Sequence, residues 1–228
     1  MNDLLAEWAG LLPQLMPGLV FTLELTALSL LFGLPLGVVL ATGTMAPARA
    51  VRWPVIVLVE IGRGAPALIL LYLVYNGLPQ IGLLLSSFPA AVIAITITTG
   101  AYSSEVFRAG LQAVPKGQRE ASRALGLSTW NEFRLVVLPQ AVRIVIPPII
   151  GLAIIVFQGT SLAYAISVPE LLSRAYNIGT ITFQFMPPLS LAGIVYAVVS
   201  LIGVALLQLP QLRRRRGRIR ALSRGIPI

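Results

Sequence analysis

Four charged side chains interrupt two otherwise apolar stretches of the sequence. Glu60 and Arg63 lie three residues apart in one stretch, and Glu105 and Arg108 have the same spacing in the other. Residues at this spacing meet on one face of a helix. An unpaired charge is costly in lipid, so we expect all four to face a bundle interior or a water-filled cavity. Two interpretations stay open: intramembrane ion pairs that lock two spans together, or part of a polar pathway or gate.

Polar residues gather near Glu105 and again about fifty residues later. Serine and threonine can bond to carbonyls of their own helix, which explains any one of them but not a cluster. We therefore expect the first group to line a cavity. In the second group, Gln158 and Gly159 favour either local unwinding around a ligand or ordinary bonds between helices. The predicted substrate pathway comprises Thr98, Thr99, Tyr102, Glu105, Gln158, Thr160 and Ser161.

The composition excludes several kinds of chemistry. The chain has 228 residues, of which 57% are hydrophobic and 11% charged, and it has no cysteine and no histidine. These numbers indicate a polytopic membrane protein. They exclude disulfides, cysteine or histidine nucleophiles and metal sites built on those ligands. No phosphate-binding G-x-x-x-x-G-K-[ST] loop and no nucleophile–base pair occurs, so we expect a chain that is not an enzyme.

Five apolar stretches are long enough to cross a membrane, and they predict an all-helical fold. Before them, the first twelve residues lack a signal-peptide pattern and predict a short helix lying at the interface. Ser29, Gly33 and Gly37 recur every fourth residue in the first stretch and favour close helix packing. The predicted spans cover residues 17–43, 54–78, 89–107, 141–166 and 189–209.

Basic residues set the predicted orientation. They concentrate in the loop after the first span, in the loop between the third and fourth spans, and in the tail, where seven of the 17 lie between Arg213 and Arg224. The positive-inside rule places these segments in the cytoplasm and the N-terminus outside. We divide the chain into a transmembrane domain, 1–212, and a basic cytoplasmic tail, 213–228. Because the tail follows a span, its charge predicts topology rather than nucleic-acid binding.

The cytoplasmic segment 115–140 is too polar to span and predicts two short helices. Residues 118–125 form the first, and Gly126 ends it. Ser128 or Thr129 caps the second, where Thr129 and Glu132 match a capping box. Glu120, Arg123 and the small residues beside them are expected on an exposed face that fits a partner's groove. An ordinary solvated loop remains the alternative.

One further short helix is expected outside the membrane, between the fourth and fifth spans. Val168-Pro169-Glu170-Leu171-Leu172 places a proline early and an acid in the first turn. This helix packs as a plug or meets an external partner; the residues do not choose between them.

The cytoplasmic segment resembles the coupling loop of bacterial ATP-binding cassette importers. That loop reads E-A-A, three residues, G, nine residues, I, one residue, L-P. Here Glu120-Ala121-Ser122 is followed by Gly126 and by Val136-Val137-Leu138-Pro139 at the same spacing. Stretches resembling the polar amino acid permeases (histidine, glutamate, glutamine and arginine) occur at 61–66, 100–108, 114–118, 160–162 and 168–172. Together the resemblance covers about residues 17–212.

The resemblance implies a type I importer permease with five spans and a coupling helix. It implies that an ABC ATPase dimer, carrying ATP and magnesium, drives transport, so this chain holds no cofactor itself. It also implies a second permease subunit, an amino acid binding protein outside, and the bacterial inner membrane with its lipid. The implied ATPase-coupling residues are Glu120, Ala121, Ser122, Ala124 and Gly126.

Two departures and one rival function accompany the resemblance. Relatives often carry Lys-Asp where this chain has Gln158-Gly159, and a polar residue where Leu152 follows Gly151. If these positions contact substrate in relatives, the pocket here is less polar and lacks an acid, which weakens the case for a cationic amino acid. Alternatively, a paired sister subunit carries the binding site. The rival is an ion-coupled secondary transporter or channel that uses Glu60 or Glu105 as proton carriers. A scaffold that transports nothing would leave the polar cluster as packing alone.

Overall fold

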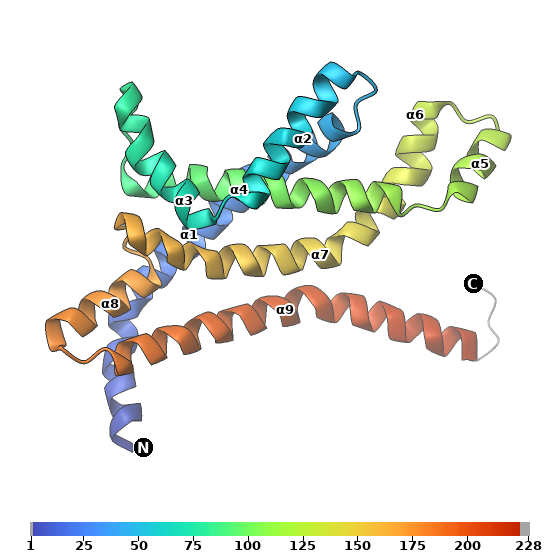
Figure 1. The fold of residues 1–228 in the computed structure, drawn as a ribbon. Coiled ribbons are helices and arrows are strands. Elements are labelled where there is room, and N and C mark those ends of the chain that lie inside the picture. Colours follow the sequence, from blue (N-terminus) through green and yellow to red (C-terminus); the bar gives the residue numbers. More distant parts are fainter. Residues whose placement is uncertain (1, 224–228) are drawn as a thin grey trace.

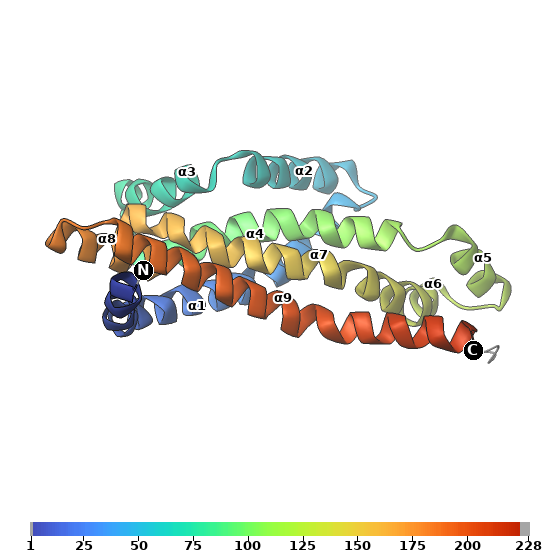
Figure 2. The ribbon, with the colours of Figure 1, turned by 90° about the horizontal axis from the view of Figure 1, so that it is seen from below.

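The computed structural model describes residues 2–223, and within them every regular element is helical (Figure 1). The predicted all-α class is confirmed. Two long helices flank a set of shorter ones, and Figure 2 shows that most of them run along one long dimension. The helices are α1 (Asn2–Thr44), α2 (Arg49–Gly64), α3 (Ala67–Tyr72), α4 (Ser87–Gln112), α5 (Lys116–Ala124), α6 (Thr129–Asn131), α7 (Leu138–Gly159), α8 (Leu171–Thr182) and α9 (Met186–Ser223).

Four continuous helical segments within the described residues are long and apolar enough to cross a membrane: Ala6–Thr44, Ser87–Gln112, Thr129–Ile166 and Met186–Ala205. A fifth crossing is present if the segments Arg49–Gly64 and Ala67–Ile81 count as one span. These two segments bend by 103° at their junction. The predicted number of five spans is therefore reached only through a broken second span.

The prediction of one helix over 54–78 is wrong in its continuity. The helix begins earlier, at Arg49, and ends at Gly64. Pro66 has no N–H to donate, and a residue before proline is disfavoured in helical conformation. Accordingly, Ala65 and Pro66 both adopt ψ angles of 130°. The chain then resumes as α3 in a new direction.

The N-terminal segment forms one continuous helix with the first predicted span. α1 runs without interruption from Asn2 to Thr44 and contains three prolines, at 13, 17 and 35. Figure 1 shows its first turns bent away from the rest, as prolines within a helix allow. Trp8 and Leu11 pack against a buried cluster that includes Leu15, Leu171 and Leu191. This apolar contact holds the segment against α8 and α9.

The small-residue stripe on α1 packs against α4. Ser29 is fully buried. A Cβ added to Gly33 would lie 2.6 Å from Thr99 Cγ2, and one added to Gly37 would lie 2.0 Å from Ser103 Oγ. Such distances leave no room for a side chain. The stripe is therefore an intramolecular contact, and it brings the two helices close enough for backbone and side chains to touch.

The buried carboxylate of Glu170 anchors α8. Its two oxygens accept hydrogen bonds from the backbone N–H groups of Leu172 at 2.8 Å and Ser173 at 2.6 Å. The Tyr196 hydroxyl of α9 donates a third bond at 2.7 Å. Glu170 is thus the N-cap residue of α8, whereas the sequence predicted it in the first turn. Burial raises the pKa of this carboxyl above its ordinary value, with its hydrogen bonds opposing the shift. α8 therefore packs against the bundle, which fits the plug interpretation.

The two ends of the bundle carry different elements. α5 and α6 lie at one end, together with the last turns of α9, whereas α8 and the first turns of α1 lie at the other (Figures 1 and 2). The α1–α2 connection lies toward the α5 end. This distribution is the one that the basic loops predict. Within the predicted basic tail, helix α9 continues to Ser223, while 224–228 lie outside the described residues.

Candidate functional site

The cytoplasmic segment folds into a compact helix–glycine–helix unit, which we call the knuckle (residues 116–131). Gly126 has a φ of +75°, in the left-handed region that favours glycine. The N–H of Gly126 donates to the Arg123 carbonyl, and the N–H of Leu127 donates to the Ser122 carbonyl. These two backbone hydrogen bonds form a Schellman motif, which ends a helix and reverses the chain. The predicted stop at Gly126 is confirmed.

The knuckle exposes most, but not all, of the residues that were predicted to couple it to a partner. Glu120, Ala121, Ala124 and Gly126 are exposed at the tip. Ser122 is buried, and its hydroxyl donates to the Arg119 carbonyl at 2.8 Å. The predicted outward position of Ser122 is therefore wrong, because the face of α5 that carries it turns toward the rest of the loop.

An ion pair braces the knuckle across its glycine turn. Arg123 Nε donates to Glu132 Oε2 at 2.8 Å, and the Glu132 side chain is 4% exposed. The predicted capping box is wrong: Ser128 caps α6 by accepting from the Asn131 N–H, which leaves Glu132 for Arg123. The hydrogen bond to Glu132 raises the pKa of Arg123 above its ordinary value.

The knuckle is rooted in the two long helices that follow and precede it. Val114, Val137 and Ala141 form a buried apolar cluster where α4 and α7 meet. Arg119 also donates to the Leu111 carbonyl of α4 at 3.1 Å. Four large apolar side chains nearby remain exposed: Leu125, Trp130, Leu135 and Leu138. An anchored tip with exposed apolar side chains is suited to contact with another protein.

A cavity of about 600 Å³, the central cavity, lies where the α2–α3 break meets α4 and α7. Thr98, Thr99 and Tyr102 contribute to its wall from α4, and Gly159 contributes from the end of α7. The break supplies the backbone of Gly64–Pro66. The size is that of a small-molecule site. Three of the predicted pathway residues therefore meet in one cavity.

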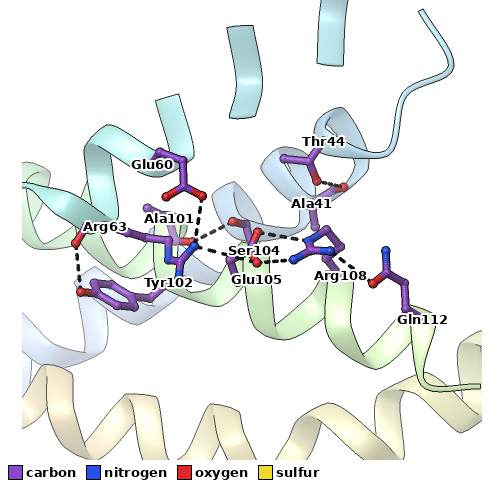
Figure 3. Close-up of polar contacts among 10 residues, drawn as sticks. All are labelled: Ala41, Thr44, Glu60, Arg63, Ala101, Tyr102, Ser104, Glu105, Arg108 and Gln112. Carbon is purple, nitrogen blue, oxygen red and sulfur yellow. Dashed lines mark hydrogen bonds and ion pairs between the residues drawn. The ribbon is translucent and has the colours of Figure 1, made fainter. Parts of the chain in front are cut away.

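The four predicted intramembrane charges form one cluster beside the central cavity (Figure 3). Arg63 Nη1 lies 3.3 Å from Glu60 Oε1, and Arg108 Nε lies 3.2 Å from Glu105 Oε1. Arg63 also reaches across to Glu105, with 3.9 Å between Nη1 and Oε2. The Tyr102 hydroxyl donates to the Arg63 carbonyl at 3.1 Å. These contacts join α2 to α4.

A second cavity, of about 420 Å³, lies on the other side of this cluster. Its wall includes Arg52, Glu60, Glu105, Arg108 and Gln112. Arg63 is the residue that links the two spaces, since its side chain lines the central cavity and pairs with two carboxylates of the second. The ion pairs thus separate an apolar cavity from a charged one.

The rest of the predicted pathway does not join the central cavity. Gln158 and Ser161 line a third cavity, of about 570 Å³, together with Tyr196. Gln158 Nε2 donates to Ser200 Oγ of α9 at 3.3 Å, an ordinary bond between helices. Thr160 is fully buried and donates to the Phe157 carbonyl. The central cavity is lined by one face of α7, on which Leu152, Ile155, Val156 and Gly159 recur at helical spacing, and Gln158 lies on another face of that helix.

The α2–α3 break is the part of the site that sequence reasoning missed. Its signal was present, since Gly64-Ala65-Pro66 interrupts an apolar run. Glycine followed by proline marks a helix end, and a broken helix at membrane depth is tolerated where it lines a cavity. The unwound backbone here does line one.

Loss of the Glu105 carboxylate should destabilise the protein more than loss of Glu60. Glu105 serves two arginines and its side chain is 25% exposed, whereas Glu60 serves one and is 63% exposed. We expect Glu105→Ala to cost about 2 kcal/mol and Glu60→Ala about 0.5 kcal/mol. Thermal unfolding of the purified protein in detergent measures both. Equal losses would show that the bridge between α2 and α4 contributes nothing.

Comparison with known proteins identifies the class to which this architecture belongs. Residues 33–216 match the family described as "Binding-protein-dependent transport system inner membrane component". The chain belongs to this family. Within it, the chain is a permease subunit of the amino-acid ABC transporters, and the type I importer fold predicted from its loop is confirmed.

Individual relatives agree with that assignment. The chain is 35% identical over 193 residues to a probable amino-acid ABC transporter permease, YckA, of Bacillus subtilis, covering 84% of this chain and 85% of the relative. It is 40% identical over 167 residues to the L-cystine transport system permease TcyB of the same organism, covering 73% and 71%. The solved structure of an amino acid ABC transporter with histidines superimposes with a TM-score of 0.86 at 32% identity, covering 90% and 96%.

Proposed function

We propose that this chain is the translocating subunit of an ATP-driven importer that carries an amino acid or a close analogue into the cell. The observation that carries the proposal is the braced knuckle, which exposes Glu120, Ala121, Ala124 and Gly126 at one end of the bundle. In this proposal the tip is the part that receives force from a partner. Membership in the binding-protein-dependent family supports the direction and the source of energy.

In this proposal an ABC ATPase dimer binds and hydrolyses ATP with magnesium, and each ATPase subunit receives one knuckle. Two knuckles require a second permease subunit, either another copy of this chain or a sister. Ser122 supports the knuckle from inside rather than touching the ATPase, because it is buried. The knuckle lies in the cytoplasm of a bacterial cell, and the N-terminus and α8 face outward toward an amino acid binding protein.

The central cavity is the proposed passage for the substrate. It is bounded by α4 and α7, the two helices in which the knuckle is rooted. Movement of the knuckle therefore tilts two walls of the cavity directly. Because a ligand shifts a conformational equilibrium only by its different affinity for the two states, ATP and the binding protein supply the bias. The cystine permease relative supports an amino acid as cargo.

Secondary transport through Glu60 or Glu105 is the rival mechanism. Both carboxylates are engaged by Arg63, and Glu105 is engaged by Arg108 as well. Four charges that neutralise one another within a cluster fit a structural bridge better than a proton carrier. The rival predicts uptake that an ionophore abolishes and that proceeds without ATP.

Coupling is tested by changing the tip of the knuckle while leaving the bundle intact. Glu120→Ala and Gly126→Val should each lower ATP-dependent uptake by about tenfold or more, which corresponds to about 1.4 kcal/mol of lost docking free energy. Gly126→Val also forces a β-branched residue to a φ of +75°. The measurement is amino acid uptake by proteoliposomes that contain the whole transporter, alongside the amount of assembled protein.

Gly117→Ala is the matched control. Gly117 lies on α5 with Glu120, its φ is not positive, and a Cβ added to it meets nothing within 4 Å. This variant should transport at the wild-type rate. If Glu120→Ala and Gly126→Val transport normally as well, the knuckle does not couple ATP hydrolysis to uptake.

A further inference from the structure

The wall of the central cavity is predominantly apolar. Ile95 of α4 faces a row of α7 side chains that includes Leu152, Ile155 and Val156, and Leu162 closes the row. An aliphatic wall stabilises a ligand through burial of apolar surface and offers no partner to a charged group. The wall therefore favours apolar side chains of a ligand over charged ones.

The charge in this wall is already neutralised. Among the described residues that line the cavity, Arg63 is the one charged residue, and no carboxylate is present. The Arg63 guanidinium is shared between Glu60 and Glu105, both of which face the second cavity. A cationic side chain entering here would meet no acid. An anionic side chain would bring a further carboxylate, besides the α-carboxylate, to an arginine whose Nη1 already pairs with two acids.

Two hydrogen-bond donors of the same wall are unused. Arg63 Nε and Thr99 Oγ1 are buried and have no hydrogen-bond partner among the described residues. The other polar groups nearby are satisfied, since Thr98 donates to the Ala94 carbonyl and Tyr102 donates to the Arg63 carbonyl. A buried donor without a partner is costly, and a carboxylate oxygen is a strong acceptor for it. The α-carboxylate is common to every amino acid.

We propose that the central cavity selects amino acids with an uncharged, apolar side chain. Arg63 and Thr99 hold the α-carboxylate, and the aliphatic wall of α7 contacts the side chain. This inference rests on the proposed function and names its substrate class. Arg63 and Thr99 then recognise a group that every amino acid has, while the aliphatic wall excludes the side chains of lysine, arginine, glutamate and aspartate.

Gly159 offers the position at which to test this selectivity. It lines the central cavity, its φ is an ordinary −66°, and a Cβ added there would meet nothing within 4 Å. Gly159→Asp places an acid on the cavity wall without a steric clash at Cβ. Gly159→Asn has nearly the same shape without the charge and serves as the matched control.

The experiment measures binding of radiolabelled leucine, arginine and glutamate to the assembled transporter in lipid nanodiscs, without its binding protein. The wild-type complex should bind leucine about tenfold or more tightly than the other two. Gly159→Asp should raise the affinity for arginine by about tenfold, while Gly159→Asn leaves it unchanged. Wild-type affinity for arginine or glutamate equal to that for leucine would overturn the inference, as would binding of none of the three.

ATP-dependent uptake by the same complex in proteoliposomes distinguishes the two levels of failure. If a charged amino acid binds as well as leucine and is taken up with ATP, the proposed selectivity for apolar side chains is wrong. The proposed transporter function still stands. Failure to take up any standard amino acid with ATP contradicts the proposed function itself.

Discussion

Gly37→Leu should prevent α1 from packing against α4. Even the first side-chain carbon would lie 2.0 Å from Ser103 Oγ and 3.1 Å from the Gly100 carbonyl oxygen. Neither the helix backbone nor a fully buried serine can withdraw far enough. We expect a loss of about 3 kcal/mol, at the upper end for an overpacked core, and a sharp fall in folded protein. Size-exclusion chromatography and thermal unfolding of the detergent-purified chain measure it.

Two further variants show whether the cause is steric. Gly10→Leu lies on the same helix, where an added Cβ meets nothing within 4 Å, and it should behave like the wild type. The smaller change Gly37→Ala should be destabilising alone and largely rescued by Ser103→Gly, which removes the opposing side chain. If Gly37→Leu folds normally, the close approach of α1 and α4 does not hold the bundle together.

Glu170→Leu should have the second large effect, at the opposite end of the molecule. The change removes the buried acceptor for two backbone N–H groups and for the Tyr196 hydroxyl; the Ser173 bond is buried and the other two are partly buried. Unsatisfied buried donors and a lost helix cap together cost about 3 kcal/mol, after allowance for the desolvation that the wild-type carboxyl suffers. The melting temperature should fall by about 6–12 °C.

Glu170→Gln separates the hydrogen bonds from the charge. Because burial raises the pKa of Glu170, the folded wild-type protein holds more protons than the unfolded chain above the ordinary glutamate pKa of about 4.3. The protonated form therefore contributes stability at low pH, and this contribution is lost as the pH rises through the folded-state pKa. The glutamine variant cannot titrate, so this part of the pH dependence should disappear. A wild-type melting temperature that rises over this range, with no change in the slope in Glu170→Gln, contradicts the assignment.

Features that depend on neighbours in the chain could be predicted from the sequence. The pairing of Glu60 with Arg63 and the end of α5 at Gly126 need only helical spacing and the preference of glycine for positive φ. The close packing at Gly33 and Gly37 follows from side-chain size alone. For each of these, the residues that matter lie within one or two turns of each other.

Features that depend on how elements dock could not be predicted in the same way. The bridge from Arg63 to Glu105 spans 42 positions, and spacing says nothing about it. Ser122 and Glu120 lie on one short helix, and which face is buried depends on where the rest of the loop packs. The predicted pathway divided among three cavities because Gly159 lines the central cavity whereas its neighbour Gln158 lines the third and Glu105 lines the second, and which space each helix face meets depends on how the helices dock.

Because the knuckle is anchored on both α4 and α7, a rotation of the knuckle would tilt both helices together. The two helices reach equally far from the knuckle to the cavity, since Thr98 to Gln112 and Leu138 to Leu152 are both 14 residue steps, a length of about 21 Å along a helix. A tilt of about 10° at the tip then gives a stroke of about 4 Å over that length. A water molecule is about 2.8 Å across. A tilt of this size at the knuckle would therefore displace the cavity walls by more than the diameter of a water molecule.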